Sequence, residues 1–143
     1  MKEIVKYRHC FVCGDENHHG LQAKFYFDGT RAISRITATE MFEGYRGIYH
    51  GGILSAMLDE VMIKAILAED IYAVTAELTV RFLKPVIVGC ELEFTGRVTE
   101  TKGRMYLTEG EVRDTDGNCY ATATAKYIRA KPDLQAKLEE SVG

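Results

Sequence analysis

The sequence predicts an α+β fold, in which an antiparallel sheet of five to six strands wraps around one long central helix. Apolar residues recur at i, i+3 and i+4 between positions 53 and 66, which is typical of a helix buried on a wide face. Residues 72–83 and 118–129 instead alternate between apolar and polar side chains, as in strands. Short Gly- and Asp-containing turns separate the segments that follow the helix, which indicates antiparallel neighbours.

The elements follow in a simple order. Segments 21–27 and 31–38 are expected to form a hairpin around the turn Asp28-Gly29-Thr30. A loop at 39–49 precedes the helix, which is expected over about 50–68. Further strands are predicted at 72–83, 91–99, 104–113 and 118–129. Ala121, Ala123 and Ala125 share one face of the last strand, where small side chains would admit a closely packed helix.

Length and composition exclude several classes of protein. At 143 residues the chain is expected to be a single domain over 1–143, with an N-terminal segment at 1–20 and a polar tail at 131–143 that holds one short helix after Pro132. A net charge of −3 argues against nucleic acid as the main partner. No apolar run is long enough to span a membrane, and none follows the first charges as in a signal peptide. We therefore expect a cytoplasmic protein whose four cysteines are reduced thiols.

The start of the predicted helix is a candidate site. Gly51 and Gly52 precede the apolar run, and the first N–H groups of a helix have no partner within it. An anion, or a carbonyl oxygen becoming one, could approach these side-chain-free positions closely. Asp59 lies inside the apolar run, where burial of an acid is costly, and is a candidate base or nucleophile. The alternative is a glycine-rich helix start with one tolerated carboxylate.

The spacing of these residues argues for a site shared between two subunits. Gly51 and Asp59 are eight positions apart, which separates them by about 12 Å along a helix and rotates them by about 80°. A base and an oxyanion donor must both lie about 3 Å from one reacting group. Two antiparallel helices across a two-fold axis could bring Gly51 of one subunit to Asp59 of the other. The spacing therefore predicts a composite site in a dimer.

Three blocks of sequence resemble a known family. The first is Cys10-Phe11-Val12-Cys13-Gly14 with Asn17 and Gly20-Leu21. The second is Phe42-Glu43-Gly44-Tyr45 followed by Gly47-Ile48-Tyr49-His50-Gly51-Gly52 and ending at Asp59-Glu60. The third is Thr75-Ala76-Glu77-Leu78-Thr79-Val80 through Lys84-Pro85. The chain resembles the hotdog-fold acyl-CoA thioesterases, most closely the branch with an N-terminal Cys-Phe-Val-Cys-Gly motif. The resemblance spans about 10–129.

The resemblance implies a role for each matching residue. Asp59 would activate water or attack the thioester, the Gly51 N–H would polarise its carbonyl, and Thr75 would help hold the water. His50 would shape the helix start and contact the thioester. Gly44 stands where many relatives have Asn, so backbone N–H groups would supply more of the oxyanion contact. The implied protein is a homodimeric or tetrameric hydrolase that converts an acyl-CoA to a free acid and coenzyme A without a cofactor.

Substrate contacts are expected around the same site. Thr75 and Arg81 lie six residues apart in one predicted strand and hence on the same face, so Arg81 could reach from the site toward a phosphate. For each basic residue the alternative is an ordinary solvated side chain. The full set of candidate substrate-binding residues is Gly52, Arg81, Lys84, Lys102, Arg104 and Asn17.

The sequence also permits other interpretations. Cys10-x-x-Cys13 followed by His18-His19 offers ligands that zinc prefers, but the spacing is tight and no second Cys pair follows. We expect a packed N-terminal segment there and no metal. A hotdog hydratase or dehydratase is disfavoured because its Asp/His pair is missing, and a non-catalytic acyl-CoA-binding protein is the alternative outside the enzymes. The sequence does not specify the acyl group of the substrate.

Overall fold

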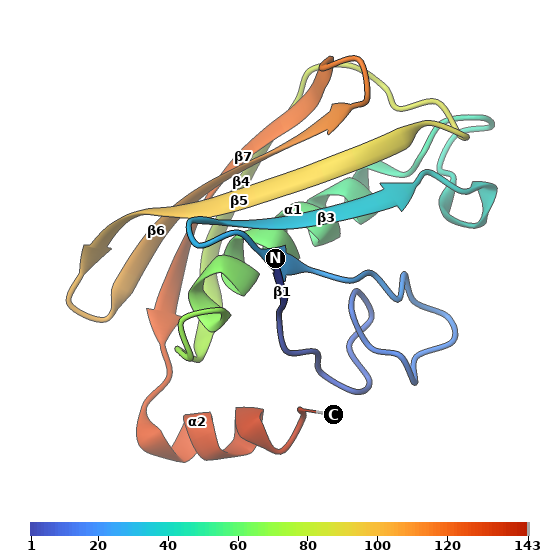
Figure 1. The fold of residues 1–143 in the computed structure, drawn as a ribbon. Coiled ribbons are helices and arrows are strands. Elements are labelled where there is room, and N and C mark those ends of the chain that lie inside the picture. The colour runs from blue at the N-terminus through green and yellow to red at the C-terminus, as the bar shows by residue number, and fades with distance from the viewer. Residues whose placement is uncertain (143) are drawn as a thin grey trace.

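The computed structural model describes residues 1–142 and has the predicted α+β architecture, with an antiparallel sheet curled around one long helix (Figure 1). The sheet has seven strands in the order β1-β2-β3-β5-β6-β7-β4. The helices are α1 (Gly51–Leu67) and α2 (Pro132–Glu139), with a 3₁₀ turn η1 (Glu40–Phe42). The strands are β1 (Lys2–Glu3), β2 (Tyr26–Phe27), β3 (Arg31–Thr37), β4 (Ala73–Phe82), β5 (Glu91–Lys102), β6 (Met105–Asp114) and β7 (Cys119–Arg129). Within 1–142, no helix has the length and apolarity that a membrane crossing requires.

The main difference from prediction is at the N-terminal edge of the sheet. The prediction of a full strand at 21–27 is wrong, because only Tyr26–Phe27 pair with β3. The amides of Leu21 and Ala23 instead donate to the carbonyls of Phe11 and Val12 at 2.9 and 2.8 Å. Two-residue strands β1 and β2 extend this edge, so the sheet has seven strands rather than five to six.

Small residues let α1 lie close against the sheet. Gly96, Gly110 and Ala123 are neighbours in register across β5, β6 and β7. A Cβ atom on Gly96 would lie 2.7 Å from the carbonyl oxygen of Val61, which is closer than real contacts allow. The three alanines of β7 are buried, as their alternation predicts. Bulkier side chains in this row would push the helix away from the sheet.

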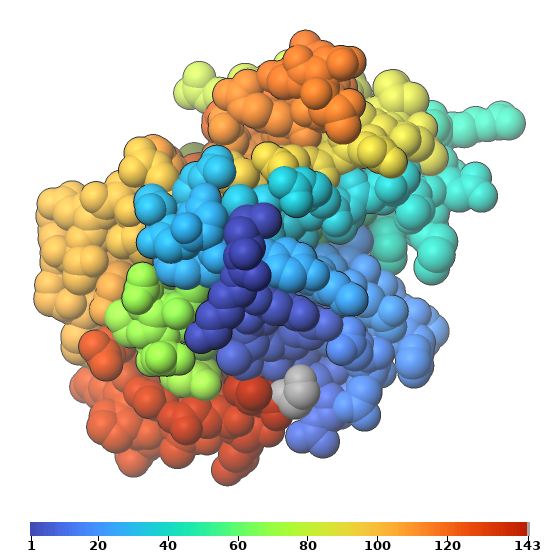
Figure 2. Space-filling view, viewed as in Figure 1, coloured from blue at the N-terminus to red at the C-terminus, as the bar shows by residue number. Residues whose placement is uncertain are grey.

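The N-terminal segment packs against both α1 and the C-terminal end of the chain. The amide of Arg8 donates to the carbonyl of Ser141 at 2.8 Å, and Tyr7 and Val142 form an isolated β-bridge. Figure 2 shows the blue N-terminal residues beside the red C-terminal ones on one face of the molecule. Lys64 of α1 is fully buried beneath this segment and its ammonium donates to the carbonyl of Val5. These contacts position the residues that border the candidate site.

Candidate functional site

Asp59 is held by side chains from two strands. It lies at the middle of α1, where it is half-buried. The hydroxyl of Thr75 in β4 lies 3.1 and 3.3 Å from the two carboxylate oxygens. The hydroxyl of Tyr127 in β7 donates to Oδ1 at 2.8 Å and lies 2.9 Å from the main-chain carbonyl of Asp59. The carboxylate is therefore oriented by two hydroxyl donors, one of them fully buried.

Tyr127 is a residue that the sequence reasoning missed. Burial, followed by the nearby charge of Asp59, raises the pKa of Tyr127 well above its usual range, so its hydroxyl keeps its proton. A signal for it was present, because Tyr127 continues the alternation of Ala121, Ala123 and Ala125 on the face toward the helix. The alternation does not indicate that the Tyr127 hydroxyl contacts Asp59.

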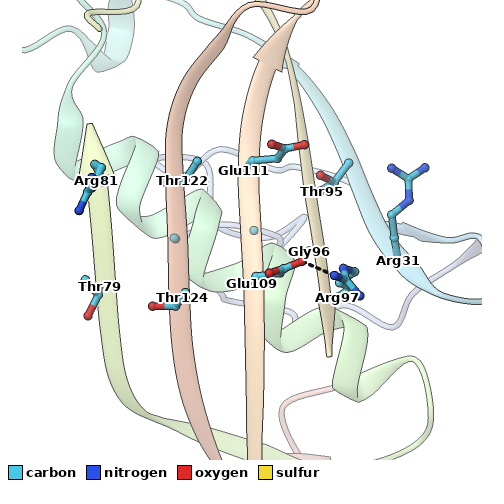
Figure 3. Close-up of a pocket in the computed structure, with 12 residues that line it drawn as sticks. Arg31, Thr79, Arg81, Thr95, Gly96, Arg97, Glu109, Glu111, Thr122 and Thr124 are labelled. Atoms are coloured by element: carbon cyan, nitrogen blue, oxygen red, sulfur yellow. Dashed lines mark ion pairs between the residues drawn. The ribbon is translucent and has the colours of Figure 1, made fainter. Parts of the chain in front are cut away.

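A β-bulge turns Thr75 toward Asp59. The register of β4 against β7 shifts between Thr75 and Glu77, so Thr75 pairs with Tyr127 on the helix side of the sheet. Beyond the bulge, Thr79 and Arg81 pair with Thr124 and Thr122 of β7, which face outward (Figure 3). The expectation that Thr75 and Arg81 share a face is therefore wrong, because the extra residue reverses the alternation.

Arg81 lies instead over the outer face of the sheet. It borders a cavity of about 560 Å³ together with Thr79, Arg97 and Glu109 (Figure 3). Arg97 and Glu109 form an ion pair across β5 and β6. Arg81 and Asp59 thus lie on opposite sides of the sheet within one subunit, and a contact of Arg81 with substrate stays a prediction.

A second cavity, of about 720 Å³, opens at Asp59 and Thr75. Its walls come from α1, the start of β4, the N-terminal segment and the residues after β7. Two exposed basic residues, Arg8 and Lys137, line it and were not expected from the sequence. They belong to segments that carry no motif, and only the folded chain brings them to the cavity.

The other predicted substrate contacts lie outside this cavity in the single subunit. The Lys84 ammonium lies 5.2 Å from the centre of the Tyr120 ring, and Lys102 lies 3.8 Å from Glu100. Arg104 donates to the carbonyl of Arg129 at 2.7 Å. Asn17 organises its own loop, since its amide donates to the carbonyl of His9 at 3.2 Å. Their roles toward substrate stay predictions.

The start of α1 has one amide in use and one open. His50 is the N-cap residue, and its Nδ1 accepts the N–H of Gly52 at 2.8 Å. The N–H of Gly51 has no acceptor among residues 1–142. Gly51 lies beside the ring of Phe82, at the far end of β4 from Thr75. Neither His50 nor Gly51 borders the Asp59 cavity, so one subunit holds the two halves of the predicted site apart.

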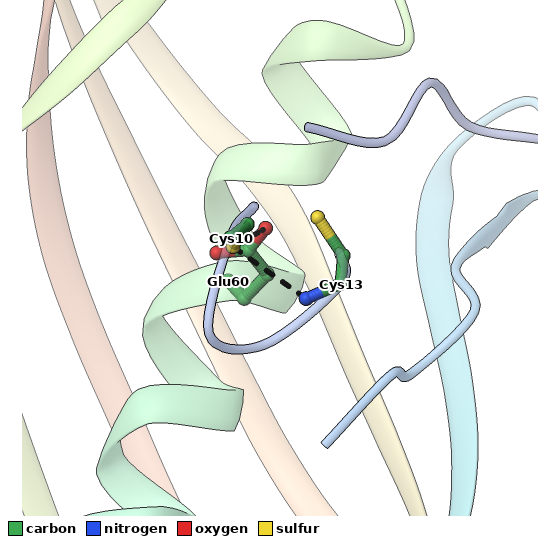
Figure 4. Close-up of side chains that lie close together, drawn as sticks. All are labelled: Cys10, Cys13 and Glu60. Carbon is green, nitrogen blue, oxygen red and sulfur yellow. Dashed lines mark hydrogen bonds between the residues drawn. The ribbon is translucent and has the colours of Figure 1, made fainter. Parts of the chain in front are cut away.

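A sulfur-rich cluster adjoins the cavity. Cys10 and Cys13 of the N-terminal segment meet Glu60 of α1, the neighbour of Asp59 (Figure 4). Hydrogen bonding with Cys13 lowers the pKa of Cys10 to about 5, whereas the same contact together with burial raises that of Cys13. Burial raises the pKa of Glu60 to about 7. The cluster lies beside the buried ammonium of Lys64, whose Nζ is 3.8 Å from Glu60 Oε2.

Comparison with known proteins identifies the family. Residues 46–121 match the thioesterase superfamily. A putative esterase of Saccharolobus solfataricus is 30% identical over 109 residues, which cover 75% of this chain and 77% of that protein. The acyl-coenzyme A thioesterase THEM4 of Xenopus laevis is 31% identical over 91 residues, which cover 63% of this chain and 41% of THEM4. This chain therefore corresponds to less than half of THEM4.

Solved structures share the fold. The thioesterase superfamily protein RHA08564 superimposes with a TM-score of 0.77 at 25% identity, over 85% of this chain and 63% of that one. The protein smu.793 of Streptococcus mutans, solved with acetyl CoA bound, has a TM-score of 0.66 at 21% identity, over 74% of this chain and 88% of that one. Sequence match and fold agree, and the chain belongs to the thioesterase superfamily.

Proposed function

We propose that the protein hydrolyses an acyl-CoA thioester to a free acid and coenzyme A, at a site formed between two subunits. The observation that carries the proposal is the Asp59 carboxylate, which faces a cavity and is oriented by Thr75 and Tyr127. A half-buried acid with two hydroxyl donors is suited to hold a water molecule or to attack an acyl carbon. The Cys10–Gly14 motif supports the branch that the sequence resembles.

The chemistry needs two partners at the thioester. Asp59 takes a proton from a water molecule that adds to the acyl carbon, or adds to that carbon itself and is released by water later. Either route makes the carbonyl oxygen an oxyanion, which the open Gly51 N–H at the positive end of α1 would stabilise. The carbon–sulfur bond then breaks, and the thiolate of coenzyme A leaves and takes up a proton.

The exposed edge of the sheet supports the pairing of two subunits. β4 is the last strand in the sheet order, so one row of its backbone groups is unpaired. Its apolar side chains remain accessible, with Val74 38%, Leu78 36% and Phe82 52% exposed. Antiparallel pairing of two β4 strands would bring the Phe82 end of one strand to the Thr75 end of the other. Because Gly51 lies beside Phe82 and Asp59 beside Thr75, Gly51 of the partner subunit would approach Asp59.

The names of relatives and the charges at the cavity walls support acyl-CoA as the substrate class. One relative is named an acyl-coenzyme A thioesterase, and one structure of the same fold was solved with acetyl CoA. Coenzyme A carries phosphates, and Arg8 and Lys137 supply positive charge at the cavity. The cavity of about 720 Å³ has the size of a pocket for a small ligand.

Release of free thiol from a panel of acyl-CoAs of different chain length, aromatic ones included, tests the activity. We expect turnover with at least one member, and Asp59→Asn should lower kcat by about 100-fold or more because a general base or nucleophile is lost. Binding without thiol release would indicate a non-catalytic protein, and hydration of an enoyl-CoA would indicate a hydratase. Either result contradicts the proposal.

Subunit complementation tests the shared site. Gly51→Pro removes the open N–H at the first helical position, where proline is well tolerated, and His50 before it already has an extended ψ of 127°. A mixed dimer of Gly51→Pro and Asp59→Asn subunits should regain one working site in two. Gly51→Ala, which keeps the amide, is the matched control. No recovery in mixed dimers, confirmed by mass, would argue that each site lies within one subunit.

A further inference from the structure

We propose that Cys10, Cys13 and Glu60 form a binding site for Zn²⁺ that ties the N-terminal segment to α1 beside the Asp59 cavity. The two Sγ atoms and a carboxylate oxygen all lie within 4.8 Å of one another (Figure 4). Thiolate sulfur and carboxylate oxygen are ligands that zinc accepts in tetrahedral sites. His18 and His19, which the sequence suggested as partners of the cysteines, are exposed and do not belong to this cluster.

The separation between Cys10 and Glu60 fits a tetrahedral ion. With Zn–S of about 2.3 Å and Zn–O of about 2.1 Å, a tetrahedral angle separates the sulfur and oxygen ligands by about 3.6 Å. The observed separation between Cys10 Sγ and Glu60 Oε2 is 3.7 Å. The two atoms therefore already lie at the distance that a shared ion requires.

The backbone around the cysteines is arranged to support thiolates. Cys10 Sγ accepts the N–H groups of Val12 and Cys13 at 3.4 and 3.5 Å, and Cys13 Sγ accepts that of Tyr7 at 3.5 Å. The turn closes through the amide of Gly14, which donates to the carbonyl of Cys10 at 2.9 Å. A Cβ atom on Gly14 would lie 2.5 Å from the carbonyl oxygen of Arg8, so this tight turn requires glycine. Such N–H donors hold metal-binding sulfurs in place from outside the ligand shell.

The charges balance when an ion is included. Two thiolates and one carboxylate carry three negative charges, and Zn²⁺ together with the ammonium of Lys64 supplies three positive ones. The Lys64 side chain is fully buried, and its Nζ lies 3.8 Å from Glu60 Oε2. Negatively charged ligands that are removed from water need nearby positive charge, because an unpaired buried charge is costly. Lys64 would therefore not bind the ion but would balance the remaining negative charge of its ligands.

The site has an open side. Cys10 and Glu60 border the Asp59 cavity, whereas Cys13 does not. A water molecule from the cavity would complete four-coordination there. Because Arg8 and Cys10 belong to the same wall, the ion would hold that wall against α1.

Cobalt titration tests this site without any activity assay. The purified full chain is stripped with a chelator, kept reduced with a phosphine, and titrated with Co²⁺, whose thiolate complexes give charge-transfer and visible absorption bands. We expect one equivalent per subunit, displaced by Zn²⁺, which binds such sites more tightly. Cys10→Ser, Cys13→Ser and Glu60→Gln should each weaken binding tenfold or more. Cys90→Ser and Cys119→Ser, which alter the other two cysteines, are the matched controls and should bind like the wild type.

Three outcomes would overturn the proposal. The first is a reduced wild-type protein that gives no thiolate–cobalt bands. The second is unchanged binding in Cys10→Ser or Cys13→Ser, or its loss in a control variant. The third is a Cys10–Cys13 disulfide that persists under the reductant, detected as two thiols missing after denaturation. Since the cysteine variants could unfold, Glu60→Gln is decisive: its thiol pair is intact, its fold is checked by circular dichroism, and Zn²⁺ should raise its Tm less than that of the wild type.

Discussion

Replacing Tyr127 by Phe removes one hydroxyl and leaves the rest of the site in place. The hydroxyl donates to Asp59 Oδ1 at 2.8 Å, and the Tyr127 side chain is fully buried. Phenylalanine fills the same space, and the carboxylate keeps its contact with Thr75 at 3.1 Å. The variant therefore tests whether the orientation of Asp59 by Tyr127 matters for turnover.

The expected effect follows from the strength of the lost bond. A hydrogen bond to a charged acceptor contributes about 1.5–3 kcal/mol, which corresponds to about 10- to 150-fold in rate if it is lost in the transition state alone. Because Thr75 still holds the carboxylate, we expect the lower end, about a tenfold fall in kcat. KM should change little, since Tyr127 does not border the cavity where substrate would lie.

Steady-state thiol release with the best acyl-CoA of the panel measures both constants, and a double-mutant cycle identifies the route of the effect. Tyr127 acts through Asp59, so Asp59→Asn combined with Tyr127→Phe should be no slower than Asp59→Asn alone. Tyr106→Phe is the matched control, because Tyr106 is a buried neighbour of Tyr127 in register and the structure describes no hydrogen bond of its hydroxyl. An unchanged kcat in Tyr127→Phe, or losses that multiply in the double variant, would refute the reasoning.

Three further results are expected. Gly96→Ala places a Cβ 2.7 Å from a main-chain oxygen of α1 and should lower the free energy of unfolding by about 1–3 kcal/mol, measured by urea denaturation; a loss below that range would mean that helix and sheet separate easily. His50→Ala removes the cap of α1 and should cost about 0.5–2 kcal/mol by the same measurement, while His50→Asn, which can cap, should recover most of it. Lys137→Ala should raise KM for acyl-CoA by about two- to fivefold without changing kcat, and Lys131→Ala, outside the cavity, should not; equal effects would remove Lys137 as a phosphate contact.

The local elements of this protein follow from its sequence because they depend on short-range periodicity. The apolar recurrence predicted α1 to within a residue at each end, and the alternation of Ala121, Ala123 and Ala125 correctly indicated the face toward the helix. Asp59 stood out because an acid in an apolar helical run is costly unless something holds it. The spacing between Gly51 and Asp59 also indicated, from helix geometry alone, that one subunit separates them.

Long-range contacts decided the rest. A bulge between Thr75 and Glu77 reverses the alternation, and a strict two-residue period cannot contain such an extra residue. Tyr127 reaches Asp59 across 68 positions and Cys10 reaches Glu60 across 50, so no window of sequence holds either pair. Local patterns report which face a residue occupies, but packing of the sheet around α1 determines which side chains on those faces meet.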